Sequence, residues 1–443
     1  MAFERVRNSR GEALREAVAA PLRRPPSLAW QRAFAVAVAA LTVGVVSAGY
    51  LLYAGLGVLG LDRAVGWGVL ITNFVFWIGV GHAGTFISAV LYLLRQPWRA
   101  AVSRSAEAMT LIAVLCAGLF PLIHLGRPAL WFYLLPYPNS RGPLWMNFRS
   151  PLVWDMLAVG TYFTVSLGFW YWGLIPDLAA LRRRVPGWRG RLYGRLSLGW
   201  DASVGTWAAY ERTYFYLAAL ATPLVISVHS VVSLDFAVTV LPGWHSTAMP
   251  PYFVVGALYS GFALVLVLSL LARRTQEARA LIGEDAVESL AKVYLALAVF
   301  MAWFYLGEVV FAWRGSEGAA WATLQERYTG EGCWRTWLML VANIGLPQLL
   351  WHPRLRSHPG LLLGLALSTL AGMWLERWIL IAGSLEQGYL PSSATALHCT
   401  VFDFGITVGA FGLFFTVYLL FLRVFPAFAL SDLERAQAGE IQR

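Results

Sequence analysis

Charge is the scarcest property of this sequence. Only 13% of the 443 residues are Asp, Glu, Lys or Arg, whereas 58% are hydrophobic and the mean hydropathy is +0.60. An average soluble domain carries about 25% charged and about 45–50% apolar residues. The deficit of charge excludes an ordinary soluble enzyme and a disordered chain, and it predicts an all-α, polytopic membrane protein.

Cysteine is also rare, which excludes a disulfide scaffold. Cys116, Cys333 and Cys399 are far apart in the chain, and no Cys-x-x-Cys motif occurs. An iron–sulfur cluster requires about four thiolates, so the chain is not expected to hold one. The sequence also contains no metal-ligand cluster, no phosphate-binding loop and no recognisable catalytic nucleophile.

An early apolar run is missing as well. The first 32 residues are polar and contain seven arginines. We therefore expect no secretory signal peptide, and the first apolar helix should act as its own membrane signal.

Ten apolar segments are long enough to span a bilayer. A hydrocarbon core of about 30 Å requires about 20 apolar residues in helical form. The segments lie at residues 34–57, 65–94, 106–125, 152–175, 208–232, 252–272, 293–313, 335–351, 360–384 and 399–422. An even number of spans places both termini on the same side of the membrane.

The net charge of +10 is distributed unevenly around these segments. Most of the 34 Lys and Arg residues lie in the N-terminal arm 1–33, in the C-terminal tail 425–443 and in the connections on the same side. The connection 176–207 alone contains six arginines and only two acidic residues. The positive-inside rule predicts that this side is cytoplasmic in a multi-pass inner-membrane protein. Topology explains these arginines without a nucleic-acid partner.

One external loop departs from this pattern. Residues 126–151 contain Arg127, Arg141 and Arg149 but no acidic residue, and they include five prolines. Loops of this length are usually functional when they are ordered. We expect this loop to dock a partner protein; the alternative is a folded cap over the helices.

Ionisable residues inside membrane spans are costly and are therefore functional candidates. His124 and Asp155 lie at the external ends of their spans, and a carboxylate can tune and orient a histidine. They are expected to form a proton-accepting pair; the alternative is a structural hydrogen bond between helices. His82, Glu107, Glu308, Glu376 and Asp403 are candidates for a proton path, and His229 lies near a span end.

Three further patterns bear on the chemistry. Glu376 and Arg377 are adjacent, so they are expected to point to opposite sides of their helix and to find separate partners. No span carries two central histidines, which argues against a haem held by two histidines. Prolines lie mainly at span ends, which argues against the broken helices of a secondary transporter.

Six longer strings resemble one protein family. They are FWIGVGHAGTFISAVLYLLRQPWR, AEAMT, PLIHLGRP, PYPNSRGPLWMNFRSPLVWD, LATPLVISVHSVVSLDFAVTVLPGWH and PPYFVVGALYSGFA. These strings are similar to the NrfD/polysulfide-reductase membrane subunits, and most similar to the quinol-oxidising membrane subunit of alternative complex III. The resemblance covers about residues 34–425.

The resemblance implies an architecture and a set of partners. It implies flanking helices at 34–64 and 399–424, a first four-helix bundle with the quinol site at 65–235, and a second bundle at 250–384. It also implies that the chain binds a quinol, such as menaquinol, near the periplasmic surface and carries no haem or iron–sulfur cluster. The implied partners are membrane lipid, an iron–sulfur or molybdopterin-type peripheral subunit, haem c subunits and a second NrfD-like membrane subunit.

The same resemblance suggests roles for individual residues. His124 and Asp155 match the histidine and aspartate proposed as the quinol site. Asn73 matches a quinone-contacting asparagine, while Phe76 replaces a histidine of some relatives. The remaining candidates for the quinol site are Thr222, which stands near the place of a tyrosine, and the neighbouring Arg127 and Arg149.

These observations predict a quinol-oxidising membrane subunit that passes electrons to an iron–sulfur partner, with proton translocation left open. Two alternatives remain. One is a structural or proton-translocating membrane subunit that binds no quinol. The other is the membrane anchor of a molybdenum oxidoreductase that reduces quinone.

Overall fold

Long helices dominate the computed structural model, which describes residues 2–62, 64–135, 150–275, 281–315, 318–387, 395 and 397–437. Within these ranges there is no β-strand, and nine helices are long and apolar enough to cross a membrane. They are α2 (Leu28–Ala54), α3 (Val69–Leu93), α4 (Arg99–His124), α5 (Pro151–Leu181), α7 (Val204–Ala237), α8 (Met249–Thr275), α9 (Glu284–Arg314), α13 (Pro359–Leu385) and α14 (Val401–Val424). The predicted all-α, polytopic membrane fold is confirmed.

The tenth predicted span, 335–351, has a different structure. It begins as a short helix α11 (Cys333–Leu340), continues as the π-helix η4 (Val341–Gly345) and ends as the 3₁₀-helix η5 (Leu346–Trp351). Pro347 lies in the last of these, where it cannot donate a backbone hydrogen bond. The segment is helical throughout but is not one of the nine long helices.

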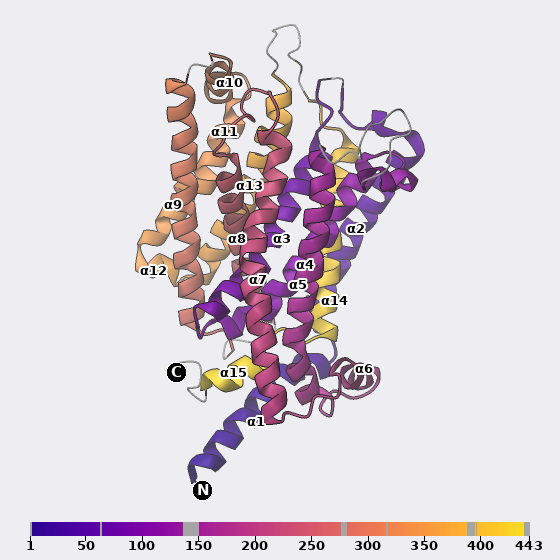
Figure 1. The fold of residues 1–443 in the computed structure, drawn as a ribbon, viewed down its shortest axis with the longest axis vertical. Coiled ribbons are helices and arrows are strands. Elements are labelled where there is room, and N and C mark those ends of the chain that lie inside the picture. The colour runs from indigo at the N-terminus through magenta and orange to yellow at the C-terminus, as the bar shows by residue number, and fades with distance from the viewer. Residues whose placement is uncertain are drawn as a thin grey trace.

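The shorter helices mark the two ends of the molecule (Figure 1). At one end, called here the terminal end, lie α1 (Ala2–Arg23), α6 (Trp188–Leu196) and α15 (Leu430–Gln437). The opposite end, called the distal end, carries α10 (Gly318–Thr329). The remaining short helices are η1 (Leu56–Val58), η2 (Pro128–Leu134) and α12 (Pro353–Arg356).

Helix α3 is the centre of the packing. It contacts α4, α7, α8, α13 and α14 and is buried along almost its whole length. Asn73 and His82 are both fully buried on it, but they are about 2.5 turns apart at ~3.6 residues per turn. Their side chains therefore point to opposite sides of the helix.

For the description of the site, the helices are divided into two sets. The first helix group consists of α3, α4, α5 and α7, and the second consists of α8, α9, the α11–η5 segment and α13. Helices α3 and α8 pack against each other and join the two sets.

Helices α2 and α14 pack closely side by side. Gly44 of α2 faces Gly409 of α14, and a Cβ on either glycine would overlap the backbone of the other helix. Small residues allow this approach in membranes, where helix association depends on van der Waals packing.

We expect Gly409→Leu to lower the free energy of unfolding by about 1–3 kcal/mol, because overpacking forces the two backbones apart. The measurement is denaturant unfolding of the purified protein in detergent. Gly49→Leu is the matched control, since nothing lies within 4 Å of a Cβ at this exposed position of α2. An equal loss in both variants would contradict close packing at Gly409.

Candidate functional site

The terminal end of the first helix group contains a buried arginine between two carboxylates. Arg104 of α4 forms ion pairs with Glu107 at 2.9 Å and with Asp177 of α5 at 3.1 Å, and all three side chains have 0% exposure. Arg104 also donates to the carbonyl oxygen of Gly173. Buried charges are tolerated only when each of them is paired. Glu107, which was a candidate for the proton path, is paired with Arg104, and the sequence did not reveal this structural partner.

A second buried arginine extends this network to the C-terminal helix. Arg99 forms an ion pair with Asp432 of α15 at 2.5 Å and donates to the hydroxyl oxygen of Tyr214 on α7. The Tyr214 hydroxyl donates to Glu107 at 3.2 Å, and the Ser88 hydroxyl donates to the same carboxylate oxygen. We call Arg99, Arg104, Glu107, Asp177, Tyr214 and Asp432 the terminal cluster.

The middle of the first helix group contains two histidines in contact. The rings of His82 on α3 and His229 on α7 lie 4.7 Å apart, and the ring of Tyr162 on α5 stacks on His82 at 4.5 Å. The Nδ1 atom of His82 lies 2.6 Å from the carbonyl oxygen of Ile78. This contact makes Nδ1 the donor, because a carbonyl oxygen only accepts.

The other ring nitrogens of this histidine pair have no hydrogen-bond partner among the described residues. They are Nε2 of His82 and both nitrogens of His229, whose rings are buried. Buried polar atoms of this kind are commonly satisfied by water. The structure thus brings together His82 and His229, which the sequence analysis treated separately.

Small hydroxyl side chains connect the histidine pair with the terminal cluster. Tyr162 donates to the carbonyl oxygen of Gly81 at 3.0 Å, and Thr85 donates to Ser166 at 3.1 Å. Ser88 lies one turn beyond Thr85 on α3 and reaches Glu107. Polar groups therefore extend through the first helix group from its middle to its terminal end.

At the distal end of this group, two buried carboxyl groups face each other. Asp155 of α5 and Asp235 of α7 are each only 5% exposed, and their side chains lie close enough to interact electrostatically. Two carboxylates so close together are stabilised when they share a proton. Asp235 was missed because the predicted span ended at 232, whereas α7 continues to Ala237.

The predicted pair of His124 and Asp155 is not joined by a hydrogen bond. His124 is half-buried at the end of α4, and its Nδ1 atom has no partner within the described part of the chain. Asp155 instead interacts with Asp235. Both residues lie at the distal ends of the neighbouring helices α4 and α5.

Asn73 lies on the other side of α3. Its side-chain amide donates to Thr407 of α14 at 2.8 Å, and its oxygen accepts from the Trp374 indole of α13 at 2.8 Å. The expected grouping of Asn73 with His124 and Asp155 is therefore wrong, because Asn73 faces away from α5 and α7. The side-chain amide of Asn73 thus links α3 to α13 and α14 by hydrogen bonds.

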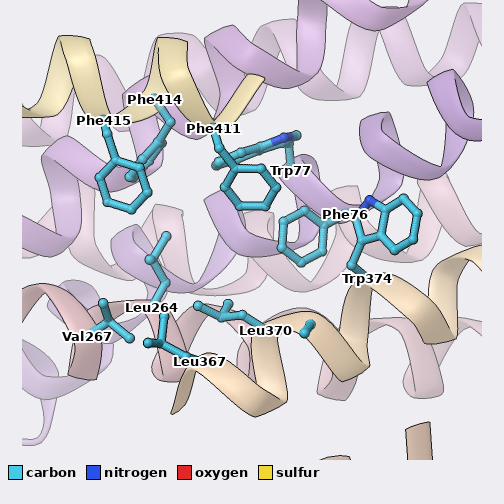
Figure 2. A pocket seen from close by; sticks show the side chains of 11 residues that line it. Phe76, Trp77, Leu264, Val267, Leu367, Leu370, Trp374, Phe411, Phe414 and Phe415 are labelled. Atoms are coloured by element: carbon cyan, nitrogen blue, oxygen red, sulfur yellow. The ribbon is translucent and has the colours of Figure 1, made fainter. Parts of the chain in front are cut away.

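An apolar cavity of about 370 Å³ lies on this same side of α3. Figure 2 shows that its wall is made of aromatic and aliphatic side chains from α3, α8, α13 and α14. Phe76 is one of the aromatic residues, so the position that is histidine in some relatives contributes only apolar surface here.

The other predicted site residues have separate positions. Arg127 is exposed at the start of η2, and Thr222 donates to the carbonyl oxygen of Ala218 in its own helix. Asp403 caps α14 together with Thr400 and also accepts from the Gly60 amide. Asp403 thus has a structural role. Arg149, like Arg141, lies outside the described residues.

The second helix group contains its own buried charges. Glu376 and Arg377 form an ion pair at 3.2 Å, so the expectation that they point to opposite sides of α13 is wrong. The long arginine side chain can fold back along the helix, which adjacency in sequence does not exclude. Glu308 of α9 forms an ion pair with Arg327 of α10 at 2.9 Å.

We expect Arg104→Met to lower the free energy of unfolding by about 3–5 kcal/mol, because it leaves two buried carboxylates without a counter-charge. Denaturant unfolding of the purified protein measures this loss. Lys292→Met is the control: Lys292 pairs with Glu288, but these side chains are 59% and 41% exposed. It should change stability by less than about 1 kcal/mol, and similar losses in both variants would refute the importance of the buried pair.

The chain is similar in sequence to proteins named as subunits of reductases. A sequence profile described as polysulphide reductase, NrfD, matches residues 57–387. A putative membrane subunit of the dimethyl sulfoxide reductase of Halobacterium salinarum is 32% identical over 266 residues, which cover 59% of this chain and 55% of that protein. A selenate reductase subunit of Mesobacillus selenatarsenatis is 22% identical over 409 residues, which cover 87% of this chain and 92% of that protein.

Proposed function

The chain belongs to the polysulphide reductase NrfD family, and from this we propose that it is the quinol-binding membrane subunit of an oxidoreductase complex. The quinol head group would bind at the distal end of the first helix group, beside Asp155 and Asp235. The observation that carries this proposal is the buried carboxyl pair at the distal end, with His124 at the distal end of the neighbouring helix α4. Buried acids at one end of a helix group are typical of proton-transfer sites.

The reaction requires acceptors for protons and for electrons. Oxidation of a quinol to a quinone releases two protons and two electrons. The ionised member of the carboxyl pair takes one hydroxyl proton, and the free Nδ1 atom of His124 takes the other, directly or through water. The electrons pass to an iron–sulfur cluster of a peripheral partner protein and then to haem c subunits.

The distal end offers a surface for such a partner. Trp131, Phe132 and Tyr133 of η2 are 46%, 44% and 48% exposed. Exposed aromatic groups rimmed by polar residues mark interaction sites, and Arg127 stands beside them. This arrangement supports docking of the peripheral protein over the carboxyl pair, where a short distance favours electron transfer.

The polar groups between the carboxyl pair and the terminal end suggest a route for protons. His229 lies six residues from Asp235 on α7, about 9 Å along the helix at ~1.5 Å per residue. A buried water next to the unpartnered ring nitrogens of His229 would bridge part of this gap. From the histidine pair, the route continues through the hydroxyl side chains to Glu107 in the terminal cluster.

The charge distribution supports an orientation for this subunit. The arginine-rich α6 lies at the terminal end with both terminal helices (Figure 1). By the positive-inside rule, this end faces the cytoplasm and the carboxyl pair faces the opposite side of the inner membrane. Quinol protons would then leave on the external side.

The named relatives favour a second candidate function. Their names identify subunits of a dimethyl sulfoxide reductase and of a selenate reductase. As the membrane anchor of such a reductase, the chain would use the same site with partners of a different kind. A reductase consumes electrons, so both candidate functions oxidise quinol and the electron acceptor separates them. Quinol oxidation coupled to reduction of dimethyl sulfoxide or selenate would favour the reductase anchor, and quinol oxidation coupled to reduction of a c-type haem protein would favour the first candidate.

We expect Asp155→Asn and Asp235→Asn each to slow quinol oxidation by about 100-fold or more, because each substitution breaks the proton-accepting carboxyl pair. The rate is measured with the purified complex, and gel filtration checks its assembly. Asp62→Asn is the control at the same end, since Asp62 is exposed and accepts hydrogen bonds, among the described residues, from Ala64, Val65 and Thr395.

The control variant should oxidise quinol at nearly the normal rate. Full activity of an assembled Asp155→Asn complex would eliminate the proposed site. It would then favour a structural membrane subunit that binds no quinol.

A further inference from the structure

The second helix group contains a buried acid that the proposed quinol reaction does not use. Glu376 lies on α13 and is 2% exposed. The hydroxyl group of Tyr252 on α8 donates to its Oε1 atom, and Arg377 forms an ion pair with its Oε2 atom at 3.2 Å. Carboxylates buried this deeply within a membrane protein commonly bind protons or ions.

The Glu376–Arg377 pair leaves polar atoms unsatisfied. Among the described residues, Oε2 of Glu376 and Nη1 of Arg377 have no hydrogen-bond partner, although both residues are almost fully buried. The guanidinium carbon of Arg377 lies 4.3 Å from the ring centre of Phe253, and its Nη2 atom occupies the space where Gly256 lacks a side chain. The arginine is therefore directed partly toward α8 and does not saturate the carboxylate.

A small cavity of about 30 Å³ adjoins Glu376. A cavity of more than about 10–15 Å³ holds a water molecule when several polar partners surround it. The polar residues that line this cavity are Tyr252, Tyr305, Glu308, Arg327, Tyr328, Thr336 and Glu376. Its size and its walls both suit one water molecule.

The cavity extends from Glu376 toward the distal end. Glu308 is 39% exposed there and forms an ion pair with Arg327, which also donates to Ser384 at 2.6 Å. Both residues of this pair line the cavity, and Glu308 is partly exposed. The route is thus short and polar, while the first helix group lies on the other side of α8.

The irregular helix segment next to this cavity fits a functional site. The π-helix η4 contains Asn343, whose side-chain oxygen is buried and has no partner in the part of the chain that the structure describes. Asn343 donates to the Tyr305 hydroxyl at 3.1 Å, and Tyr305 lines the cavity. π-Helical turns within membrane helices frequently occur at functional sites.

We propose that Glu376 is a proton-binding site of the second helix group, reached from the distal end through a water molecule in the Glu308–Arg327 cavity. A proton from external water moves through this water to Oε2 of Glu376 and returns by the same route. No electron is transferred. The charged or titratable groups that surround Glu376 are Arg377 on α13, Tyr252 on α8, Tyr305 and Glu308 on α9, and Arg327 and Tyr328 on α10.

Infrared difference spectra test this site without quinol turnover. The full-length protein in lipid nanodiscs is compared at acidic and alkaline pH, and the carbonyl band of a protonated carboxylic acid is recorded. We expect one band that is present at acidic pH, shifts in D₂O and is missing in Glu376→Gln. If no band depends on Glu376, the residue stays ionised beside Arg377 and the proposal is wrong.

A pair of variants at Thr336 tests the proposed water route. Thr336 lines the cavity and is 4% exposed. Thr336→Leu should fill the cavity and slow deuterium exchange of the band at least ~10-fold, whereas Thr336→Val keeps the volume and should leave the exchange rate nearly unchanged. Equal exchange rates in these two variants would overturn the proposed water route. Neither measurement depends on whether quinol is oxidised at the carboxyl pair.

Discussion

Hydrocarbon offers no partner to an ionised side chain, and this constraint organises the interior of the molecule. Arg104 is held between Glu107 and Asp177, and Arg99 is held by Asp432. The Arg104–Asp177 and Arg99–Asp432 pairs join helices that are separate in sequence, so satisfying the charges also determines how the helices pack. Among the described residues, the buried polar atoms without hydrogen-bond partners include those of the functional candidates.

The unpartnered atoms of the candidate residues lie in two separate regions. In the first helix group they belong to His82, His229, His124, Asp155 and Asp235. In the second group they belong to Glu376, Arg377 and Asn343. The proposed quinol site and proton route use the first region, and the proposed proton-binding site uses the second.

Helix α8 stands between the two regions and contacts both. Phe253 on α8 packs against His229 on one side, with ring centres 5.8 Å apart, and against the Arg377 guanidinium on the other. The charge of Arg377 also acts on His229. Arg377, which pairs with Glu376, therefore contacts the helix that joins the two groups.

Much of the fold could be predicted from hydropathy, and the candidate site only in part. The segment 335–351 was correctly predicted to be apolar and helical, but its π and 3₁₀ turns were not foreseen. Asp155 and His124 were found because each is an ionisable residue near a span end. Asp235 was not found because it lies beyond the apolar run, and Asn73 was grouped with His124 and Asp155 although its side chain contacts α13 and α14.

The sequence by itself determined that this is a helical, multi-pass membrane protein of the NrfD family, because apolar length and long matching strings are local properties of the chain. Only the tertiary structure decided which polar groups meet. Asp155 pairs with Asp235 and His82 contacts His229 because of how each helix is rotated about its axis. That rotation depends on packing against several neighbours at once, and hydropathy along one chain does not record it.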